Sequence, residues 1–200
     1  MKVINLFGEP SAGKSATMHS LAGKMKKMGL SVDVGLEFYK EMVYDNTPSE
    51  NLNFDNIVNN TENQVKRFGG QLYVLAEQNK RLSRLNGTVD YVITDCPLPL
   101  IAYYTPQNYL AGFENMVINL FNTYDNFNIY VKKNHQFEHN ARIHNEQQAM
   151  QIGKELPLYL KNFTDDIIDI YTSNIIEDEI INILKERNII KNSKKGLRPW

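Results

Sequence analysis

Apolar residues follow two rhythms along this chain, and together they predict strands that alternate with helices. Short apolar runs that are rich in β-branched side chains and bounded by turn residues predict strands at 2–7, 31–36, 91–94, 128–131 and 167–171. Apolar positions three or four residues apart predict helices at 16–28, 38–44, 62–85, 107–123 and 175–187, and one that ends near residue 159. This alternation is typical of α/β proteins, in which helices cover both faces of a parallel sheet.

Glycine and proline set the limits of several of these elements. Gly69 and Gly70 interrupt the predicted helix at 62–85 and indicate a kink or a break into two helices. Pro97 and Pro99 closely follow the third strand, so the chain must leave the sheet there. We expect residues 1–190 to form one domain around a single core, and the basic segment 191–200 to be a loose C-terminal tail.

The turn between the first predicted strand and the first predicted helix carries a phosphate-binding pattern. It reads Gly8, Glu9, Pro10, Ser11, Ala12, Gly13, Lys14 and Ser15, and Ala16 follows it. In such a loop the glycines let successive backbone N–H groups point into one concavity at a helix N-terminus, where phosphate binds. Lys14 can reach the β- and γ-phosphates, and the Ser15 hydroxyl can ligate Mg²⁺. A plain glycine turn is the alternative, but strand, loop and helix in this order favour a nucleoside triphosphate site that uses ATP and Mg²⁺.

Composition narrows the functional classes. The chain has 200 residues, and its 22 Lys and Arg nearly balance 23 Asp and Glu, so no global positive field indicates nucleic-acid binding, although a local basic patch is compatible with these counts. The single cysteine, Cys96, rules out an internal disulfide and fits a reducing cytosol. No apolar run approaches the roughly 20 residues that a membrane span requires, so we expect a soluble cytoplasmic protein.

Two carboxylates follow predicted strands, at the edge where open α/β sheets bind ligands. Asp95 directly follows the third strand and is interpreted as a Mg²⁺ ligand, with a structural cap of the next turn as the alternative. Glu37 follows the second strand. It is a candidate general base that accepts a proton from an attacking hydroxyl or orients that hydroxyl, and equally a candidate N-cap for the helix at 38–44.

The polar segment after the fourth strand is predicted to form a small mobile lid at about 133–150. Within it, Arg142 is a candidate to close over the triphosphate and to stabilise charge on the transferred group. A solvated loop arginine is the alternative. His135, His139 and His144 lie in the same segment, but no cysteine or carboxylate completes a usual zinc spacing, so we interpret them as polar lid residues.

Candidates for contact with the phosphoryl acceptor lie on two predicted helices. Lys80, Arg81 and Arg84 lie about one turn apart and form either a solvated surface or a contact with phosphate, on a nucleotide or on DNA. Phe38 and Tyr39 are candidates to stack on a base, although aromatic residues in such elements more often belong to the core.

Three stretches of the chain resemble a known group of proteins: 3–15 with the phosphate-binding loop, 92–98 around Asp95, and 140–142 with Arg142. They are similar to bacteriophage-encoded P-loop kinases related to the nicotinamide riboside kinase domain, whose Glu-x-x-x-Glu pattern after the second strand is similar to Glu37 and Glu41 here. The resemblance extends to about residue 171 and implies a P-loop NTPase fold with five parallel strands in the order 2-3-1-4-5. This group includes kinases that phosphorylate 5-hydroxymethyluracil within DNA.

Together these features predict an ATP- and Mg²⁺-dependent kinase that transfers the γ-phosphoryl group to a nucleoside-like acceptor. The acceptor is a free nucleotide, a nucleoside or a modified base in DNA, and these alternatives stay open at this point. The rival hypothesis is an ATP-hydrolysing switch or motor that acts on a protein or nucleic-acid partner. Dependence of ATP turnover on an added acceptor distinguishes the two.

Overall fold

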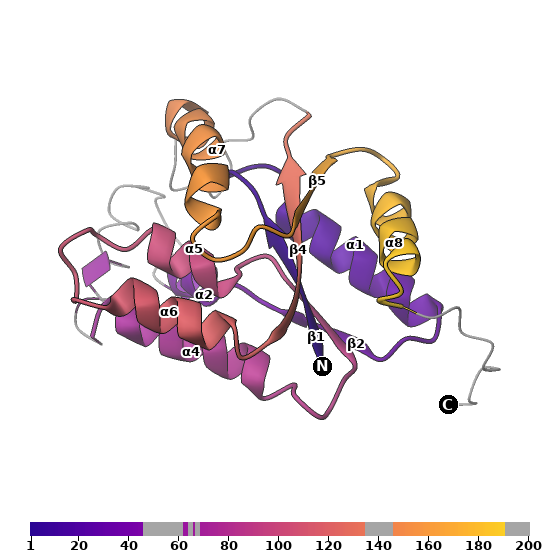
Figure 1. Ribbon diagram of the computed structural model, residues 1–200, viewed down its shortest axis with the longest axis horizontal. Helices are drawn as coiled ribbons and strands as arrows, with labels where there is room; N and C mark the ends of the chain where they lie inside the picture. The colour runs from indigo at the N-terminus through magenta and orange to yellow at the C-terminus, as the bar shows by residue number, and fades with distance from the viewer. Residues whose placement is uncertain (46–61, 64–65, 67–68, 135–145, 191–200) are drawn as a thin grey trace.

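Strands and helices alternate along most of the chain (Figure 1). The computed structural model of the protein describes residues 1–45, 62–63, 66, 69–134 and 146–190. Its elements, in chain order, are β1 (Lys2–Phe7), α1 (Lys14–Lys27), β2 (Val32–Gly35), α2 (Phe38–Asp45), α4 (Gln71–Ser83), β3 (Tyr91–Thr94), α5 (Leu98–Tyr103), α6 (Phe113–Phe121), β4 (Asp125–Lys132), α7 (Glu146–Leu160), β5 (Ile167–Tyr171) and α8 (Ile176–Glu186).

The strands form one parallel sheet in the order β2-β3-β1-β4-β5. β1 lies in the middle and pairs with β3 on one side and β4 on the other, so the loop that follows it emerges at the centre of the sheet edge. This order and the helices on both sides confirm the expected P-loop NTPase-like fold. In parallel sheets of this kind, ligands bind at the carboxyl ends of the strands.

Side chains alternate between the two faces of the sheet, and each face therefore has its own apolar core. On β1, Phe7 packs into one core, while Ile4 and Leu6 pack into the other. β3 divides in the same way between Val92 and Ile93. Helices α4 to α7 cover the first face, and α1 and α8 cover the second (Figure 1). Because both faces are covered, β1 is buried almost throughout, as expected of a central parallel strand.

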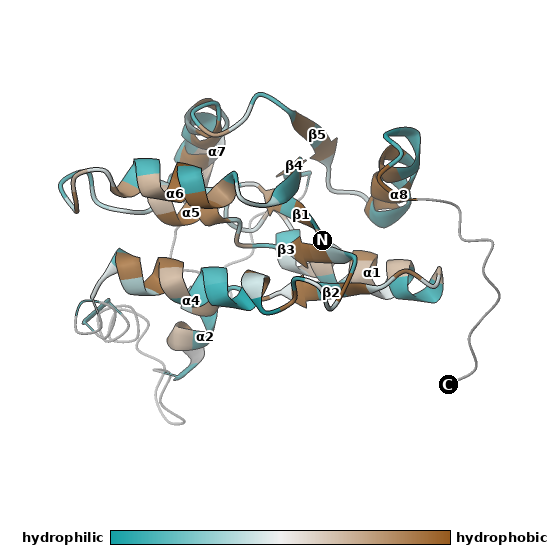
Figure 2. Ribbon diagram, turned by 60° about the horizontal axis from the view of Figure 1, so that its bottom comes forward, coloured by the Kyte–Doolittle hydropathy of each residue, from teal (hydrophilic) through white to brown (hydrophobic). Residues whose placement is uncertain are grey.

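The outer helices have one apolar side and one polar side, as α8 illustrates. Its buried residues are Ile176, Ile180, Ile181 and Leu184. Its first turn is acidic, and negative side chains there stabilise the helix because the N-terminal end of the helix dipole is positive. Figure 2 shows both apolar and polar residues around this helix. Within the described part of the chain, the helices are too short or too polar to cross a membrane.

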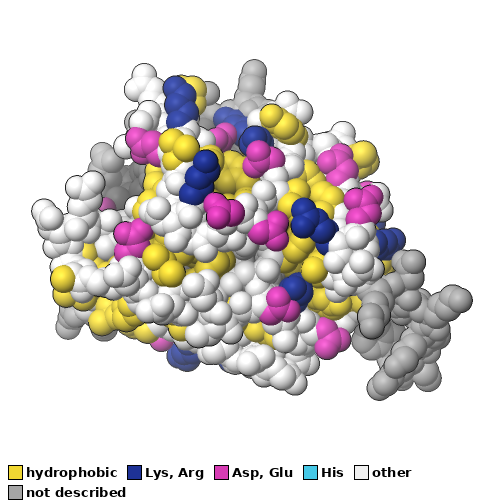
Figure 3. Space-filling model, viewed as in Figure 1, with side chains coloured by type: hydrophobic (Ala, Val, Ile, Leu, Met, Phe, Trp, Pro, Cys, Tyr) yellow, Lys and Arg dark blue, Asp and Glu magenta, His cyan; other side chains and the backbone are white. Residues whose placement is uncertain are grey.

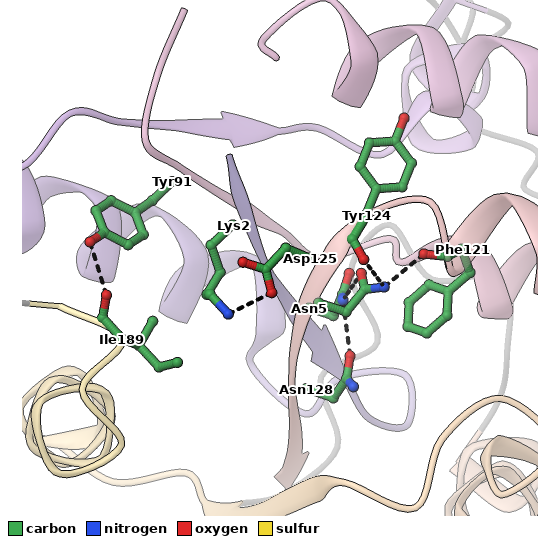
Figure 4. A network of polar contacts seen from close by, with 9 residues as sticks. Lys2, Asn5, Tyr91, Phe121, Tyr124, Asp125, Asn128 and Ile189 are labelled. Atoms are coloured by element: carbon green, nitrogen blue, oxygen red, sulfur yellow. Dashed lines mark hydrogen bonds and ion pairs between the residues drawn. The ribbon is translucent and has the colours of Figure 1, made fainter. Parts of the chain in front are cut away.

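Amide side chains join β1 to β4 (Figure 4). Asn5 is buried, and its Nδ2 donates to Oδ1 of Asn126 at 2.9 Å and to Oδ1 of Asn128 at 3.0 Å. Asn126 Nδ2 in turn donates to the carbonyls of Phe121 and Tyr124, which precede β4. A buried amide is costly unless it is hydrogen-bonded, so this network favours the observed register, in which Asn5 lies opposite Asn128.

Two predicted helices need correction. The helix expected at 62–85 is interrupted: α4 begins at Gln71, after Gly69 and Gly70, whose φ angles of 104° and 68° are outside the helical range. The break confirms the expected effect of this glycine pair. A side chain at position 70 would also collide with Tyr109, because its Cβ would lie 2.9 Å from the Tyr109 hydroxyl oxygen.

The helix expected at 107–123 begins only at Phe113, because Gly112 has a left-handed φ of 79°. A separate helix that sequence patterns did not predict, α5, occupies Leu98–Tyr103. Its Pro99 lies in the first turn, where the N–H groups have no partner within the helix and a missing N–H costs nothing. A proline that cannot continue a strand therefore suits the start of this helix. The chain therefore turns directly from β3 into α5 at the carboxyl edge of the sheet.

Candidate functional site

The phosphate-binding loop lies between β1 and α1, and glycine is required at two of its positions. Gly8 has a φ of 148°, and a Cβ there would lie 2.5 Å from the carbonyl oxygen of Val131 on β4. Gly13 has a φ of 81° and immediately precedes α1. Ser11 also has a positive φ, 64°, which is uncommon for a residue with a side chain. These angles curve the backbone of the loop around the N-terminus of α1.

A contact from β5 holds this loop in place, and sequence patterns gave no sign of it. The hydroxyl of Thr172 lies 3.1 Å from the carbonyl oxygen of Ala12 and 2.9 Å from that of Lys132, and its one proton is shared between these two acceptors. Thr172 follows β5, 160 residues after Ala12. Because it bonds both the loop and β4, the end of β5 fixes the height of the loop above the sheet.

The side chain of Lys14, the first residue of α1, folds back over the P-loop. Its Nζ donates to the carbonyl oxygens of Gly8 and Glu9, both at 2.9 Å. These bonds hold the ammonium group over the loop. A cation in this place can attract the phosphate oxygens of a nucleotide.

Ser15 and Asp95 form the closest polar pair of the site. The hydroxyl of Ser15, in the first turn of α1, donates to Oδ2 of Asp95 at 2.5 Å. Asp95 follows β3 and is buried, and its other oxygen, Oδ1, has no hydrogen-bond partner among the described residues. A hydroxyl and a carboxylate are oxygen ligands of the kind that Mg²⁺ prefers, and a buried carboxylate oxygen without a partner is costly. The residues present therefore fit a Mg²⁺ ion beside this pair.

One cavity of about 410 Å³ brings these groups together, and we call it the P-loop cavity. It is lined by the loop from Ser11 to Ser15, the start of α1, Asp95, Glu37 and the turn between β5 and α8. Glu37 is partly buried between β2 and α2, so the structure brings it to the same cavity as Asp95, as expected from the two strand ends. Further lining residues that sequence patterns did not indicate are Thr172, Ser173 and Asn174 in the β5–α8 turn, and Ile176 and Glu177 at the start of α8.

The cavity is also electrostatically uneven. Burial, and then the carboxylates of Glu37 and Asp95, raise the pKa of the adjacent Cys96 well above the usual value of a thiol. Cys96 therefore stays a neutral thiol at neutral pH and lacks the thiolate that a nucleophile requires. Acidic side chains therefore line the same cavity as Lys14.

The candidate acceptor residues on α2 and α4 lie in different environments. Phe38 is buried and packs edge-on against Tyr73, with ring centroids 5.4 Å apart, so it belongs to the core. Tyr39 is partly buried; burial, and then the carboxylates of Glu62 and Glu37, raise its pKa.

The predicted basic face on α4 divides into two parts. Arg81 is mostly buried, and its two terminal nitrogens donate to the two carboxylate oxygens of Glu41 at 2.7 and 2.6 Å. Lys80 is exposed, with Glu77 at 3.4 Å, and Arg84 is exposed at the end of the helix. Arg81 is thus engaged in joining α4 to α2. On the face drawn in Figure 3, basic and acidic side chains are interspersed and form no single basic patch.

A second cavity, of about 860 Å³, lies between α5, α6 and α7, and we call it the tyrosine cavity. The aromatic residues that line it are Tyr103, Tyr104, Tyr109, Phe113 and Tyr159. Its charged lining residues are two acids, Glu114 and Glu155, and no lysine, arginine or histidine of the described chain lines it. Burial, and then the carboxylate of Glu37, raise the pKa of Tyr104.

Several predicted site residues lie outside the described residues. These are Arg142, His135, His139, His144 and the basic tail 191–200. Of the predicted lid at about 133–150, residues 146–150 form the start of α7. Among the residues that the structure describes, no group of three or more His, Cys, Asp or Glu side chains gathers as a metal site would require.

Comparisons with known proteins bear on the fold. No protein-family model matches the chain, and no curated protein sequence matches it. A solved structure described as the crystal structure of NadR protein in complex with NR is similar, with a TM-score of 0.61 and 16% sequence identity. The match covers 98% of this chain and 52% of that one, so the chain spans about half the length of that protein.

A structure described as the crystal structure of APE1195 matches 94% of this chain and 95% of its own, with 16% identity and a TM-score of 0.40, which is too low to establish a shared fold. The likeness to NadR, at low identity, shows architecture and not activity. The chain has a P-loop NTPase-like fold.

Proposed function

We propose that this protein is an ATP- and Mg²⁺-dependent kinase that transfers the γ-phosphoryl group of ATP to a hydroxyl of a nucleoside-like acceptor. The observation that carries the proposal is the Ser15–Asp95 pair at 2.5 Å, with Lys14 and Glu37 on the same cavity. A phosphoryl-transfer site needs a cation for the phosphates, oxygen ligands for a metal and a group that orients the nucleophile. These four side chains supply all three.

Each residue has a distinct task in this proposal. The backbone N–H groups of the P-loop and the ammonium group of Lys14 bind the β- and γ-phosphates, and Ser15 and Asp95 hold Mg²⁺. When bound, Mg²⁺ neutralises charge on the phosphate oxygens. Glu37 orients the acceptor hydroxyl and accepts its proton as the oxygen forms its bond to the γ-phosphorus and the bond from that phosphorus to the β–γ bridging oxygen breaks. The products are ADP and a phosphomonoester. We further propose, from sequence alone, that Arg142 acts on the transferred group.

The lining of the tyrosine cavity supports a nucleoside as the acceptor over a nucleotide or DNA. Its volume is within the usual range for small-molecule sites, and tyrosine rings can stack on a base. A nucleotide phosphate or a DNA backbone calls for lysine or arginine, and those described residues that line the cavity include neither. The cavity is lined by the last residues of α5, the helix that begins three residues after Asp95, and transfer requires that the acceptor hydroxyl reach Glu37 from there.

Incubation with γ-labelled ATP and a panel of acceptors tests the proposal. The panel contains nucleosides, nucleotides, and duplex DNA with and without 5-hydroxymethyluracil. We expect label on a nucleoside, in a Mg²⁺-dependent reaction. Label on hydroxymethylated DNA instead would keep the kinase but reject the acceptor proposed here, and label on no acceptor despite ATP turnover would favour the switch or motor.

A further inference from the structure

Gln78 is a polar side chain buried entirely within an apolar core. It lies on α4 with 0% of its surface exposed, among Val74, Leu75 and Leu82 on the same helix. Burial of an amide is unfavourable unless both of its polar ends are hydrogen-bonded. Both ends of Gln78 are bonded, and both partners are backbone groups of another segment.

Those partners flank Glu37. Gln78 Oε1 accepts from the N–H of Phe38 at 2.9 Å, and Gln78 Nε2 donates to the carbonyl of Leu36 at 3.2 Å. Leu36 lies just beyond the end of β2, and Phe38 is the first residue of α2, whose N–H has no partner within that helix. The amide of Gln78 therefore replaces the ladder and helix bonds that the backbone lacks at Glu37.

Two further contacts make this turn rigid. Arg81, three residues after Gln78 on α4, pairs with Glu41 on α2 and lies 5.2 Å from the ring centroid of Phe38. On the sheet side, Thr94 Oγ1 donates to the carbonyl of Gly35 at 2.8 Å. It also accepts from the N–H of Cys96 at 3.2 Å. The strand ends that carry Glu37 and Asp95 are thereby fastened to each other and to α4.

We propose that Gln78 is a positioning residue, which acts through Glu37 and fixes the distance of that carboxylate from Asp95 and the P-loop. The inference rests on the proposed function, because it takes Glu37 as the group that orients the acceptor. Catalytic groups must be held closely, and a displacement of about 1 Å can lower a rate by about a hundredfold. Gln78 touches neither cavity itself.

Gln78→Met is the test, because methionine keeps the volume and removes both hydrogen bonds. Asn79→Leu is the matched control: Asn79 is the next residue on α4, and its Oδ1 accepts from the hydroxyl of Tyr124 at 2.6 Å, away from Glu37. We expect Gln78→Met to lower kcat about tenfold to a hundredfold while KM for ATP is unchanged. Asn79→Leu should lower the melting temperature comparably and leave kcat near wild type. Equal kcat for the two variants overturns the proposal.

A double-mutant cycle separates positioning from general loss of structure. If Gln78 acts through Glu37, then Gln78→Met added to Glu37→Gln should lower kcat by less than about twofold further. Multiplicative losses would contradict the proposal. Should Gln78→Met fail to fold, Gln78→Asn, which keeps the amide on a shorter side chain, is judged by the same cycle. An inactive wild-type protein would reject the proposed kinase. An active wild-type protein whose two variants show multiplicative losses in kcat would reject only the role of Gln78.

Discussion

The P-loop cavity and the tyrosine cavity are built from opposite chemistry. The first is lined by backbone of a strand–loop–helix turn, small hydroxyl side chains, Lys14 and the carboxylates of Glu37, Asp95 and Glu177. The second is lined by aromatic rings and amides, and its charged lining residues among those described are acids. The first cavity suits an anion and a metal, and the second suits an uncharged ring. The difference implies that donor and acceptor of the phosphoryl group are selected independently.

Lys14→Ala should produce the largest effect, because it removes the positive charge from the P-loop cavity. We expect phosphoryl transfer to fall by about 10³-fold, because a preorganised positive charge at the phosphates is lost. The melting temperature should stay near that of the wild type, since the Lys14 ammonium is partly buried beside the loop carbonyls that it bonds and is no part of either apolar core. Lys27→Ala, at an exposed position of the same helix, is the control for a lost lysine. Wild-type turnover in Lys14→Ala would reject the P-loop assignment.

Asp95→Asn should have the second-largest effect on activity. The amide keeps the shape of the side chain but loses the charge that would hold Mg²⁺, so we expect the Mg²⁺ concentration for half-maximal activity to rise about tenfold or more. A Mg²⁺ titration at saturating ATP measures this change. If midpoint and maximal rate are unchanged, Asp95 is a structural cap of the turn before α5.

Tyr104→Leu tests the tyrosine cavity alone. Loss of one ring that stacks on a base should raise KM for the acceptor by about tenfold and leave KM for ATP unchanged. Tyr171→Leu is a matched control, because Tyr171 is likewise exposed and lines neither cavity. An increase in KM for ATP of the same size would show that the two cavities do not select their ligands independently.

Thr172→Val should have the smallest effect, and it tests the P-loop cavity alone. The valine keeps the shape but cannot bond the carbonyl of Ala12, so the P-loop loses its tether to β5. A neutral hydrogen bond contributes about 1 kcal/mol, which corresponds to an increase of about fivefold in KM for ATP. KM for the acceptor should not change. A selective effect on the acceptor would contradict our description of the two cavities.

The P-loop cavity was largely predictable from sequence, because much of it is local. Gly8, Gly13, Lys14 and Ser15 lie within one turn, and Asp95 and Glu37 follow strands whose carboxyl ends must meet in a parallel sheet. Thr172 was not predictable, because a single threonine distant in sequence carries no pattern.

The tyrosine cavity was not predictable for a related reason. It is formed by α5, α6 and α7, and α5 is an element that the prolines near its start concealed. The interpretation of Arg81 as part of a basic face overlooked Glu41, which lies 40 residues earlier. Helical spacing places residues on one side of a helix, but it does not show what packs against that side.

The central claim is that ATP turnover is coupled to transfer, and phosphorus NMR of a single-turnover reaction tests it most directly. With a nucleoside acceptor present, the account predicts that ADP and a phosphomonoester appear together in equal amounts. Without acceptor, ADP should form far more slowly. Equal rates of ADP formation with and without acceptor, accompanied by inorganic phosphate, would contradict the account and identify an ATPase.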